Sequence, residues 1–455
     1  MKPNIILIVV DTLRRDAIQP YNKRSKTPNI NNLSKDSNVF KNAISPSPWT
    51  LPSHASLFTG LYPTEHKVRN LPDMDISTNF FKMRELLREN KSILLAEELR
   101  KRGYNTVASV ANPILSPESG FDEGFDVYMQ INYAGVNDRY KIDEVRKRYG
   151  NLELGILPRI LLDGNVSYLA DVLKYFYGTW DDYKRSGQPL IKGGTSILDL
   201  ILNSSFEQPF FLFLNLMEMH EPYLKSDFLR DVINRNVYTN ILDAAGVKNF
   251  RQSLIKKYNK AYFEEAGFLD SIIAKLISHL KASGVYDNTV IVLTSDHGQA
   301  LREKNFFGHG TFLYDEIIKI PMIIKLPENK KIKIREGYQS LASLKDFILH
   351  QVDNGGTEDT ITEERVFSEE NRKKIFLTPN LARFEDIISE TLASRRCVFR
   401  NGFKLSVNGE EGSIEEFTLN GSTVTESEYP QEFNDLLYEL EIFKGNDNLK
   451  LPREV

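Results

Sequence analysis

Four short apolar runs, each bounded by polar or turn residues, constrain the fold of this chain more than any other feature. They are Ile5 to Val10, Thr106 to Val110, Phe210 to Leu216 and Thr289 to Leu293. Continuous apolar runs of this length are typical of strands that are buried on both faces of a parallel sheet. Segments with helical periodicity lie between them, among them Ile93 to Arg102 and Phe263 to Ala282. The alternation predicts an α/β/α sandwich with a mostly parallel central sheet.

Just past the end of each apolar run lie polar side chains of the kinds that bind metal ions or anions. They are Asp11, Asn112, Glu218 with His220, and Asp296 with His297. Ligands of open α/β sheets bind outside the carboxyl ends of the strands, so we expect these side chains at one edge of the sheet. Because the four strands lie far apart in the chain, the sequence predicts a composite site at that edge.

The segment from Ser47 to Gly60 reads as a loop that becomes a helix at Pro52 and ends at Gly60. Proline suits the first position of a helix. The Thr50 hydroxyl would then lie beside free backbone N–H groups and the positive end of the helix dipole, where a tetrahedral anion is held favourably. A threonine hydroxyl is a weak nucleophile until a base or a cation lowers its pKa, so this interpretation requires a metal ion nearby.

Asp11, Asp296 and His297 can supply the ligands of that ion. Two carboxylates and one imidazole suit a divalent cation that keeps positions open for a nucleophile and a substrate oxygen. The sequence therefore predicts one divalent metal ion, with Mn, Ca, Mg and Zn all compatible.

The chain is expected to form a catalytic domain over residues 1–330 and a smaller C-terminal subdomain over 331–455. Two stretches, about 129–207 and 224–257, are read as insertions that cover the site and set substrate choice, with plain surface helices as an equally weighted alternative. In the C-terminal part, Arg396 to Arg400 and Phe403 to Val407 flank Asn401-Gly402, which predicts a hairpin in a small antiparallel sheet.

Composition excludes several partners. With 58 Lys and Arg against 62 Asp and Glu, the net charge of -4 gives no field that would gather nucleic acid. No stretch reaches the roughly 18 to 20 apolar residues that a membrane span needs. We find no signal-peptide pattern and a single cysteine, Cys397, and expect a cytoplasmic location. The sequence does not exclude assembly of this chain into a homo-oligomer.

Six motifs in order resemble those of sulfatases and phosphonate monoester hydrolases, the sulfatase branch of the alkaline phosphatase superfamily. They are Asn4 to Asp16, Thr27 to Ile30, Trp49 to Thr64, Met217 to Tyr223, Thr294 to Gly298 with Gly308-His309-Gly310 and Leu313 to Glu316, and Arg396 to Phe417. The resemblance covers most of the chain and implies an alkaline-phosphatase-like fold and an ester hydrolase.

By that resemblance, each candidate residue receives a role. The implied metal ligands are Asp11, Thr50, Asp296 and His297. The implied catalytic residues are Thr50, as the nucleophile, and His220 and His309, which would contact the anion or assist the leaving group. The expected substrate contacts are His54, Asn112 and Thr311. The last three stand where sulfatases usually carry an arginine, a lysine and histidine pair, and a lysine. The second metal set of two-metal relatives, an Asp and a His four apart on a helix, is not visible at Asp270.

The residue at the nucleophile position separates the reaction classes. Sulfatases proper need Cys or Ser there, because it is oxidised to formylglycine, and Thr50 cannot follow that route. This favours direct attack on phosphorus, as in related phosphodiesterases. A sulfuric ester hydrolase, a phospho-group transferase acting on glycan or lipid head groups, and a non-catalytic binder of anionic glycans remain alternatives. The expected substrate is a small-molecule, glycan or lipid-head-group ester.

Overall fold

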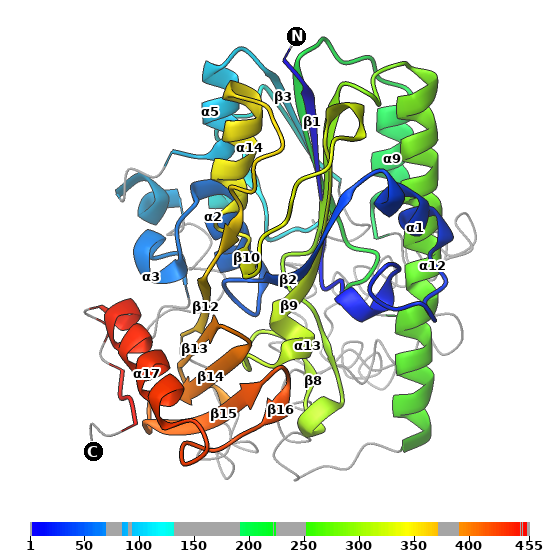
Figure 1. Ribbon diagram of the computed structural model, residues 1–455. Coiled ribbons are helices and arrows are strands. Elements are labelled where there is room, and N and C mark those ends of the chain that lie inside the picture. Colours follow the sequence, from blue (N-terminus) through cyan, green and yellow to red (C-terminus); the bar gives the residue numbers. More distant parts are fainter. Residues whose placement is uncertain are drawn as a thin grey trace, which may run out of the picture.

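The computed structural model describes residues 2–69, 84–89, 93–131, 192–221, 223, 252–371, 391–445, 447 and 449–452. Its centre is a nine-stranded sheet (Figure 1). From one edge to the other the strands are β11 (Thr362–Glu363), β10 (Tyr338–Ser340), β2 (Asn38–Ile44), β9 (Lys319–Lys325), β6 (Thr289–Thr294), β1 (Asn4–Val10), β5 (Phe210–Leu216), β3 (Asn105–Val110) and β4 (Val127–Gln130). The four strands that the apolar runs predict are confirmed and are neighbours in this sheet.

Most of the sheet is parallel. Strands β6, β1, β5, β3 and β4 all run in one direction, and β10 is parallel to β2. Strand β9 is antiparallel to both β6 and β2, and β11 is antiparallel to β10. The carboxyl ends of β1, β5, β3 and β6 therefore meet at one edge.

Helices cover both faces of the sheet (Figure 1). One face carries α2 (Thr50–Thr59), α5 (Leu95–Lys101) and α14 (Leu344–Asp353), and the other carries α1 (Pro28–Lys35), α9 (Gly194–Leu202) and α12 (Gln252–Ala282). Alternate residues of β1 enter different cores: Ile5 and Leu7 face the first layer, whereas Ile6 and Ile8 face the second. Burial on both faces explains the unbroken apolar run and confirms the α/β/α sandwich.

A second sheet of five antiparallel strands follows. It consists of β12 (Arg365–Glu370), β13 (Arg395–Arg400), β14 (Phe403–Asn408), β15 (Ser413–Leu419) and β16 (Ser422–Thr423), and α17 (Pro430–Lys444) packs on it. Asn401 and Gly402 join β13 to β14 with φ of 51° and 85°, the left-handed conformations that a tight hairpin turn requires. The predicted hairpin and small antiparallel sheet are confirmed.

The remaining described elements are short. They are α3 (Pro63–His66), α13 (Asp315–Ile318), the two-stranded ribbon β7 (Ala300–Leu301) and β8 (Phe307–Gly308), and the 3-10 helices at Arg15–Ala17, Pro117–Ser119, Glu303–Asn305 and Pro327–Asn329. Strands β10 and β11 lie beyond residue 330 and still belong to the large sheet. The predicted insertions, 129–207 and 224–257, fall mostly outside the described residues. In the part of the chain that the structure describes, no helix is both long and apolar enough to cross a bilayer.

Helix α2 differs from its prediction in one respect. It begins at Thr50 rather than at Pro52, and ends as predicted at Gly60, whose φ is 79°. The first N–H groups of a helix have no acceptor within it, so proline is tolerated at the third position as well as at the first. The shift puts Thr50 itself on the first turn.

Candidate active site

The carboxyl ends of two adjacent strands bring three candidate metal ligands together. Asp11 follows β1, and Asp296 and His297 follow β6. One ligand atom from each lies within 4.8 Å of the other two. His297 Nε2 is 3.9 Å from Asp11 Oδ1 and 3.5 Å from Asp296 Oδ2. Among the described residues, this is the one group of three acidic, cysteine or histidine side chains arranged to hold a metal ion.

The donor atoms of this cluster fit a divalent cation. Asp11 Oδ1 and Asp296 Oδ2 are buried and accept no hydrogen bond from any described residue. Burial raises the pKa of Asp11 to about 6 and that of Asp296 to about 7, and the charge of Asp296 adds to the first of these shifts. His297 donates its Nδ1–H to the Gly298 carbonyl at 2.9 Å, which leaves Nε2 as the lone-pair donor facing the carboxylates.

Asn112 supports the cluster from the end of β3. Its Nδ2 donates to Asp11 Oδ2 at 2.5 Å, and its Oδ1 accepts from the backbone N–H of Ile114 at 2.8 Å. Its own backbone N–H donates to the side-chain oxygen of Asn215, a buried residue of β5, at 2.9 Å. Both ends of the Asn112 amide are thus committed to protein partners, and the contact with Asp11 orients that carboxylate. The sequence did not single out Asn215, because it lies inside an apolar strand.

Thr50, on the first turn of α2, lies next to Asp11 and His297. Its Oγ1 is 3.4 Å from Asp11 Oδ2 and 3.5 Å from His297 Nε2. The loop before it is tied to the ligands, because Ser45 Oγ donates to the carbonyl of Asp296 at 2.5 Å. Ser53 Oγ also lies 2.9 Å from Ser45 Oγ, so the loop and the first turn form one bonded unit.

His54 contacts Thr50 through the backbone of α2. The ring is fully buried, donates from Nδ1 to the Thr50 carbonyl at 2.9 Å and has the same nitrogen 3.6 Å from Asp296 Oδ2. Phe121 and Phe213 pack on it edge to face. Burial in this apolar setting lowers the pKa of His54 to about 3, so the ring is neutral and bonds as an uncharged donor.

His220 and His309 lie beside the metal-ligand cluster. The His309 ring centroid is 4.6 Å from that of His297 and 5.3 Å from that of His220. Thr311 lies two residues after His309; its carbonyl accepts from Arg395 Nη1 at 3.4 Å, and its buried hydroxyl has no hydrogen-bond partner among the described residues. The described contacts therefore join His220 and His309 to the cluster but not Thr311.

Glu218 follows β5 at the same edge and serves a structural purpose. Its Oε1 accepts from the backbone N–H of Gly194, the first residue of α9, at 2.8 Å. A carboxylate at this position satisfies a free N–H group and complements the helix dipole. Any side chain at residue 194 would come within 2.3 Å of that oxygen, so the close approach requires the glycine.

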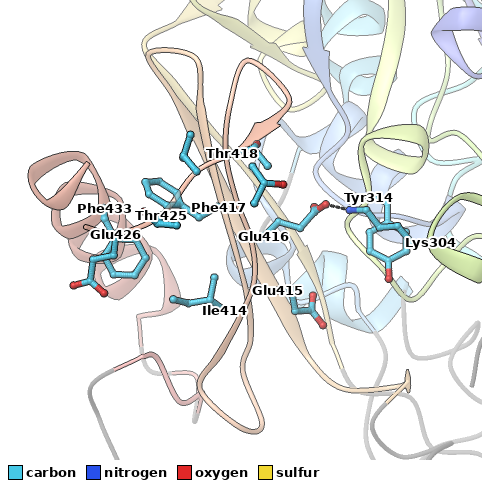
Figure 2. Close-up of a pocket in the computed structure, with 12 residues that line it drawn as sticks. Lys304, Tyr314, Ile414, Glu415, Glu416, Phe417, Thr418, Thr425, Glu426 and Phe433 are labelled. Carbon is cyan, nitrogen blue, oxygen red and sulfur yellow. Dashed lines mark ion pairs between the residues drawn. The ribbon is translucent and has the colours of Figure 1, made fainter. Parts of the chain in front are cut away.

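A hollow of about 600 Å³ lies away from this cluster, against the C-terminal sheet (Figure 2). Glu416 points into it and forms ion pairs with Lys304 and Lys404. Lys304 also lies over the ring of Tyr314, 4.3 Å from its centroid. Glu415 is likewise paired with Arg395, and none of the three candidate metal ligands lines this hollow, so we do not take it as the reactive centre.

A model of the family described as Sulfatase matches residues 3–353, which is most of the chain. The chain belongs to the sulfatase family. The matched stretch contains every residue of the metal-ligand cluster, Thr50, His220 and His309.

Individual relatives agree with this assignment. A sulfatase of Formosa agariphila is 27% identical over 73% of this chain and 66% of its own length. An arylsulfatase of Clostridium perfringens is 24% identical over 72% of this chain and 69% of its own length. The chain thus spans about two thirds of the length of these relatives.

The structure of a phosphonate monoester hydrolase of Agrobacterium radiobacter superposes with a TM-score of 0.60 at 15% identity, covering 97% of this chain and 95% of the other. At that identity the likeness shows the fold, which is the alkaline-phosphatase-like architecture that the motifs imply. The family and its relatives point to a hydrolase of sulfuric or phosphoric esters, as predicted.

Proposed function

We propose that this sulfatase-family chain is a metal-dependent hydrolase that cleaves phosphate or phosphonate esters, or sulfate esters, with Thr50 as its nucleophile. The observation that carries the proposal is the place of the Thr50 hydroxyl, 3.4 Å from Asp11 Oδ2 and 3.5 Å from His297 Nε2 at the start of α2. Family membership supports the reaction class. The threonine supports phosphorus over sulfur, because threonine cannot be oxidised to formylglycine.

Asp11, Asp296 and His297 are the proposed protein ligands of one divalent cation, to which Thr50 would add its hydroxyl. When bound, such an ion lowers the pKa of a neighbouring hydroxyl and neutralises charge that builds on an ester oxygen. The chain itself adds the backbone N–H groups of the first turn of α2, which have no acceptor within the helix and can hold two oxygens of a tetrahedral anion.

The proposed reaction has two halves. Thr50 Oγ, whose proton passes to solvent water, forms a bond to phosphorus while the bond to the leaving oxygen breaks, and the protonated Nε2 of His309 or His220 gives that oxygen its proton. In the second half the same nitrogen takes a proton from water, whose oxygen attacks phosphorus and releases Thr50. With an alcohol in place of water, the second half becomes transfer to an acceptor.

The test is turnover of aryl sulfate, aryl phosphate monoester, phosphodiester and aryl phosphonate substrates with Mn²⁺, Ca²⁺, Mg²⁺ or Zn²⁺. Thr50→Ala and Asp296→Ala should each lower kcat by at least about a thousandfold, since nucleophile and metal act as one unit. Thr59→Ala is the matched control, because it removes a buried hydroxyl from the other end of the same helix, where Thr59 Oγ1 donates to the Ala55 carbonyl at 2.6 Å. It should retain kcat.

Other outcomes separate the alternatives. Turnover of sulfate alone would overturn the inference from threonine to phosphorus and favour a sulfuric ester hydrolase. Product on an added glycan or glycerol acceptor in preference to water would favour a transferase. Metal binding without turnover of any ester would favour a non-catalytic binder of anionic glycans. Activity that survives Thr50→Ala would move the nucleophile elsewhere.

The substrate roles predicted for His54, Asn112 and Thr311 stay predictions. The contacts of His54 with Thr50, and of Asn112 with Asp11, support roles in holding those two residues in place. The small-molecule, glycan or lipid-head-group substrate, the identity of the metal and the cytoplasmic location likewise stay predictions of the sequence.

A further inference from the structure

Gln299 is a buried residue whose side chain lies between His309 and Glu221. It follows Gly298, is fully buried, and is anchored through its backbone: its N–H donates to the Glu316 carbonyl at 3.1 Å and its carbonyl accepts from Arg14 Nη1 at 3.1 Å. With the backbone held on both sides, its side chain can serve as a fixed hydrogen-bonding arm.

The two ends of the Gln299 amide have different partners, and one partner fixes which end is which. Nε2 lies 2.7 Å from Glu221 Oε2, and an ionised carboxylate can only accept a hydrogen bond. The NH₂ group must therefore face Glu221. The amide oxygen then faces Nδ1 of His309 at 2.6 Å, and since that oxygen can only accept, Nδ1 must carry a hydrogen.

We propose that Gln299 is a positioning residue that sets the tautomer of His309. With the hydrogen held at Nδ1, the neutral ring has its lone pair at Nε2, so Nε2 is the atom that takes up or releases a proton. The proposed leaving-group chemistry needs that nitrogen for its proton transfer, and in this respect the inference rests on the proposed function. The assignment of the tautomer itself rests only on the hydrogen bonds.

Glu221 contacts both Gln299 and the second histidine, His220. Its carboxylate orients Gln299, while its backbone carbonyl accepts from Nδ1 of His220 at 2.8 Å. Both histidines therefore hold a hydrogen at Nδ1 and keep Nε2 for proton transfer. A single residue, Glu221, thus links the protonation pattern of two rings whose centroids are 5.3 Å apart.

The tautomer can be read directly by two-bond ¹H–¹⁵N correlation spectra of the whole chain with labelled histidine, at one neutral pH. The chain has seven histidines, and His309→Asn identifies the relevant signals. In the parent protein we expect His309 as the Nδ1–H form. In Gln299→Met, which keeps side-chain length but removes both hydrogen bonds, we expect the Nε2–H form to appear. Glu221→Gln is a second, isosteric variant: an amide there can donate or accept, so the orientation of Gln299 is no longer fixed and the two forms should mix.

Kinetics provide a separate readout. For an ester with a poor alkyl leaving group, kcat of Gln299→Met should fall about tenfold with little change in KM, whereas a nitrophenyl ester, whose leaving group needs no proton, should be affected far less. Gln339→Met is the matched control, since Gln339 is a buried glutamine of β10 whose amide donates to Thr362 Oγ1 at 2.9 Å, outside the site. It should leave the His309 signals and both kcat values unchanged.

Two results would overturn the inference. One is His309 as the Nε2–H form in the parent protein, and the other is the same Nδ1–H spectrum in Gln299→Met and Glu221→Gln as in the parent. An equal loss of kcat for both esters would refute the link from tautomer to proton transfer. If no ester is turned over, the proposed function fails, but the spectra still decide the assignment of the tautomer.

Discussion

Replacing Asp296 by asparagine should stabilise the metal-free protein, although it removes a proposed metal ligand. Asp296 Oδ1 accepts from the backbone N–H groups of Thr12 at 3.3 Å and His297 at 2.9 Å, and an amide oxygen can keep both bonds. Its Oδ2, by contrast, lies 3.6 Å from His54 Nδ1 and 3.5 Å from His297 Nε2 without forming a hydrogen bond to either, and can be replaced by an NH₂ group that donates to His297 Nε2. The substitution therefore deletes an uncompensated buried charge and retains the hydrogen bonds.

The size of the effect follows from the pKa. Burial raises the pKa of Asp296 from 3.8 to about 7, and each unit corresponds to about 1.4 kcal/mol, so the ionised carboxylate costs on the order of 4 kcal/mol. Because the folded-state pKa lies above the unfolded-state value, the folded form retains a proton that the unfolded form releases. The stability of the metal-free parent should thus fall as pH rises from about 4 to about 7 and stay low above that. At about 2.1 cal/mol/K per residue for a chain of this length, the gain in Tm of Asp296→Asn at pH 8 is about 4 °C.

The assay is thermal unfolding after chelation, at pH 5 and pH 8, with and without added divalent metal. Metal at a hundred times its Kd should stabilise the parent by about 2.7 kcal/mol and should leave Asp296→Asn unchanged. Asp270→Asn is the control, because Asp270 is also buried, yet its carboxylate accepts hydrogen bonds from both nitrogens of Asn29 and from the Ile30 N–H. It should lose stability at both pH values, with or without metal. A chelated Asp296→Asn protein that melts below the parent at pH 8 would refute the reasoning.

Three further substitutions test other parts of the structure. Asn112→Ala removes the amide that orients Asp11, a proposed metal ligand, and should weaken metal binding about 10- to 100-fold by calorimetry; unchanged affinity would show that Asn112 does not support the metal site. Glu218→Ala leaves the N–H of Gly194 without its acceptor and should cost about 1–3 kcal/mol in urea unfolding, whereas Glu218→Gln should retain most of the stability and both should keep kcat. Gly298→Ala places a methyl group 2.2 Å from the Glu316 carbonyl oxygen, so both Tm and metal affinity should drop; a normal Tm would show that the backbone adjusts.

Much of the fold could be predicted because the central strands are buried on both faces. Strands buried on both faces are almost continuously apolar, which makes them easy to recognise in a sequence. Strand β5 was predicted with its observed bounds, Phe210–Leu216. The edge strands could not be found in this way. Strand β10 has only three residues, Tyr338–Ser340, and β11 only two, so neither produces a recognisable apolar run. The long helix α12 extends to Gln252, eleven residues before the segment that its periodicity indicated.

The candidate site was predictable where residues follow strands, and not where they act through side-chain geometry. Asp11, Asp296 and His297 could be grouped because the carboxyl ends of parallel strands share one edge. The same rule could not tell that Glu218 binds the start of α9, since that contact depends on which way one side chain turns. Gln299 was missed for a similar reason: nothing in the sequence indicates that its amide bridges two segments of the chain.

The position of β1 between β5 and β6 has a consequence for biosynthesis. Thr12 and Asp296, which share a hydrogen bond, are 284 residues apart, and at about 5–20 residues per second the ribosome needs roughly 14 to 57 s to make that stretch. Until β5 has been synthesised, β1, whose residues are all buried in the finished protein, has neither of its neighbours and exposes an apolar strand that chaperones can bind; until β6 follows, it has only one of them. The proposed metal ligands, Asp11, Asp296 and His297, come together only when β6 has joined the sheet, so a nascent chain cannot form the complete proposed metal site before that step.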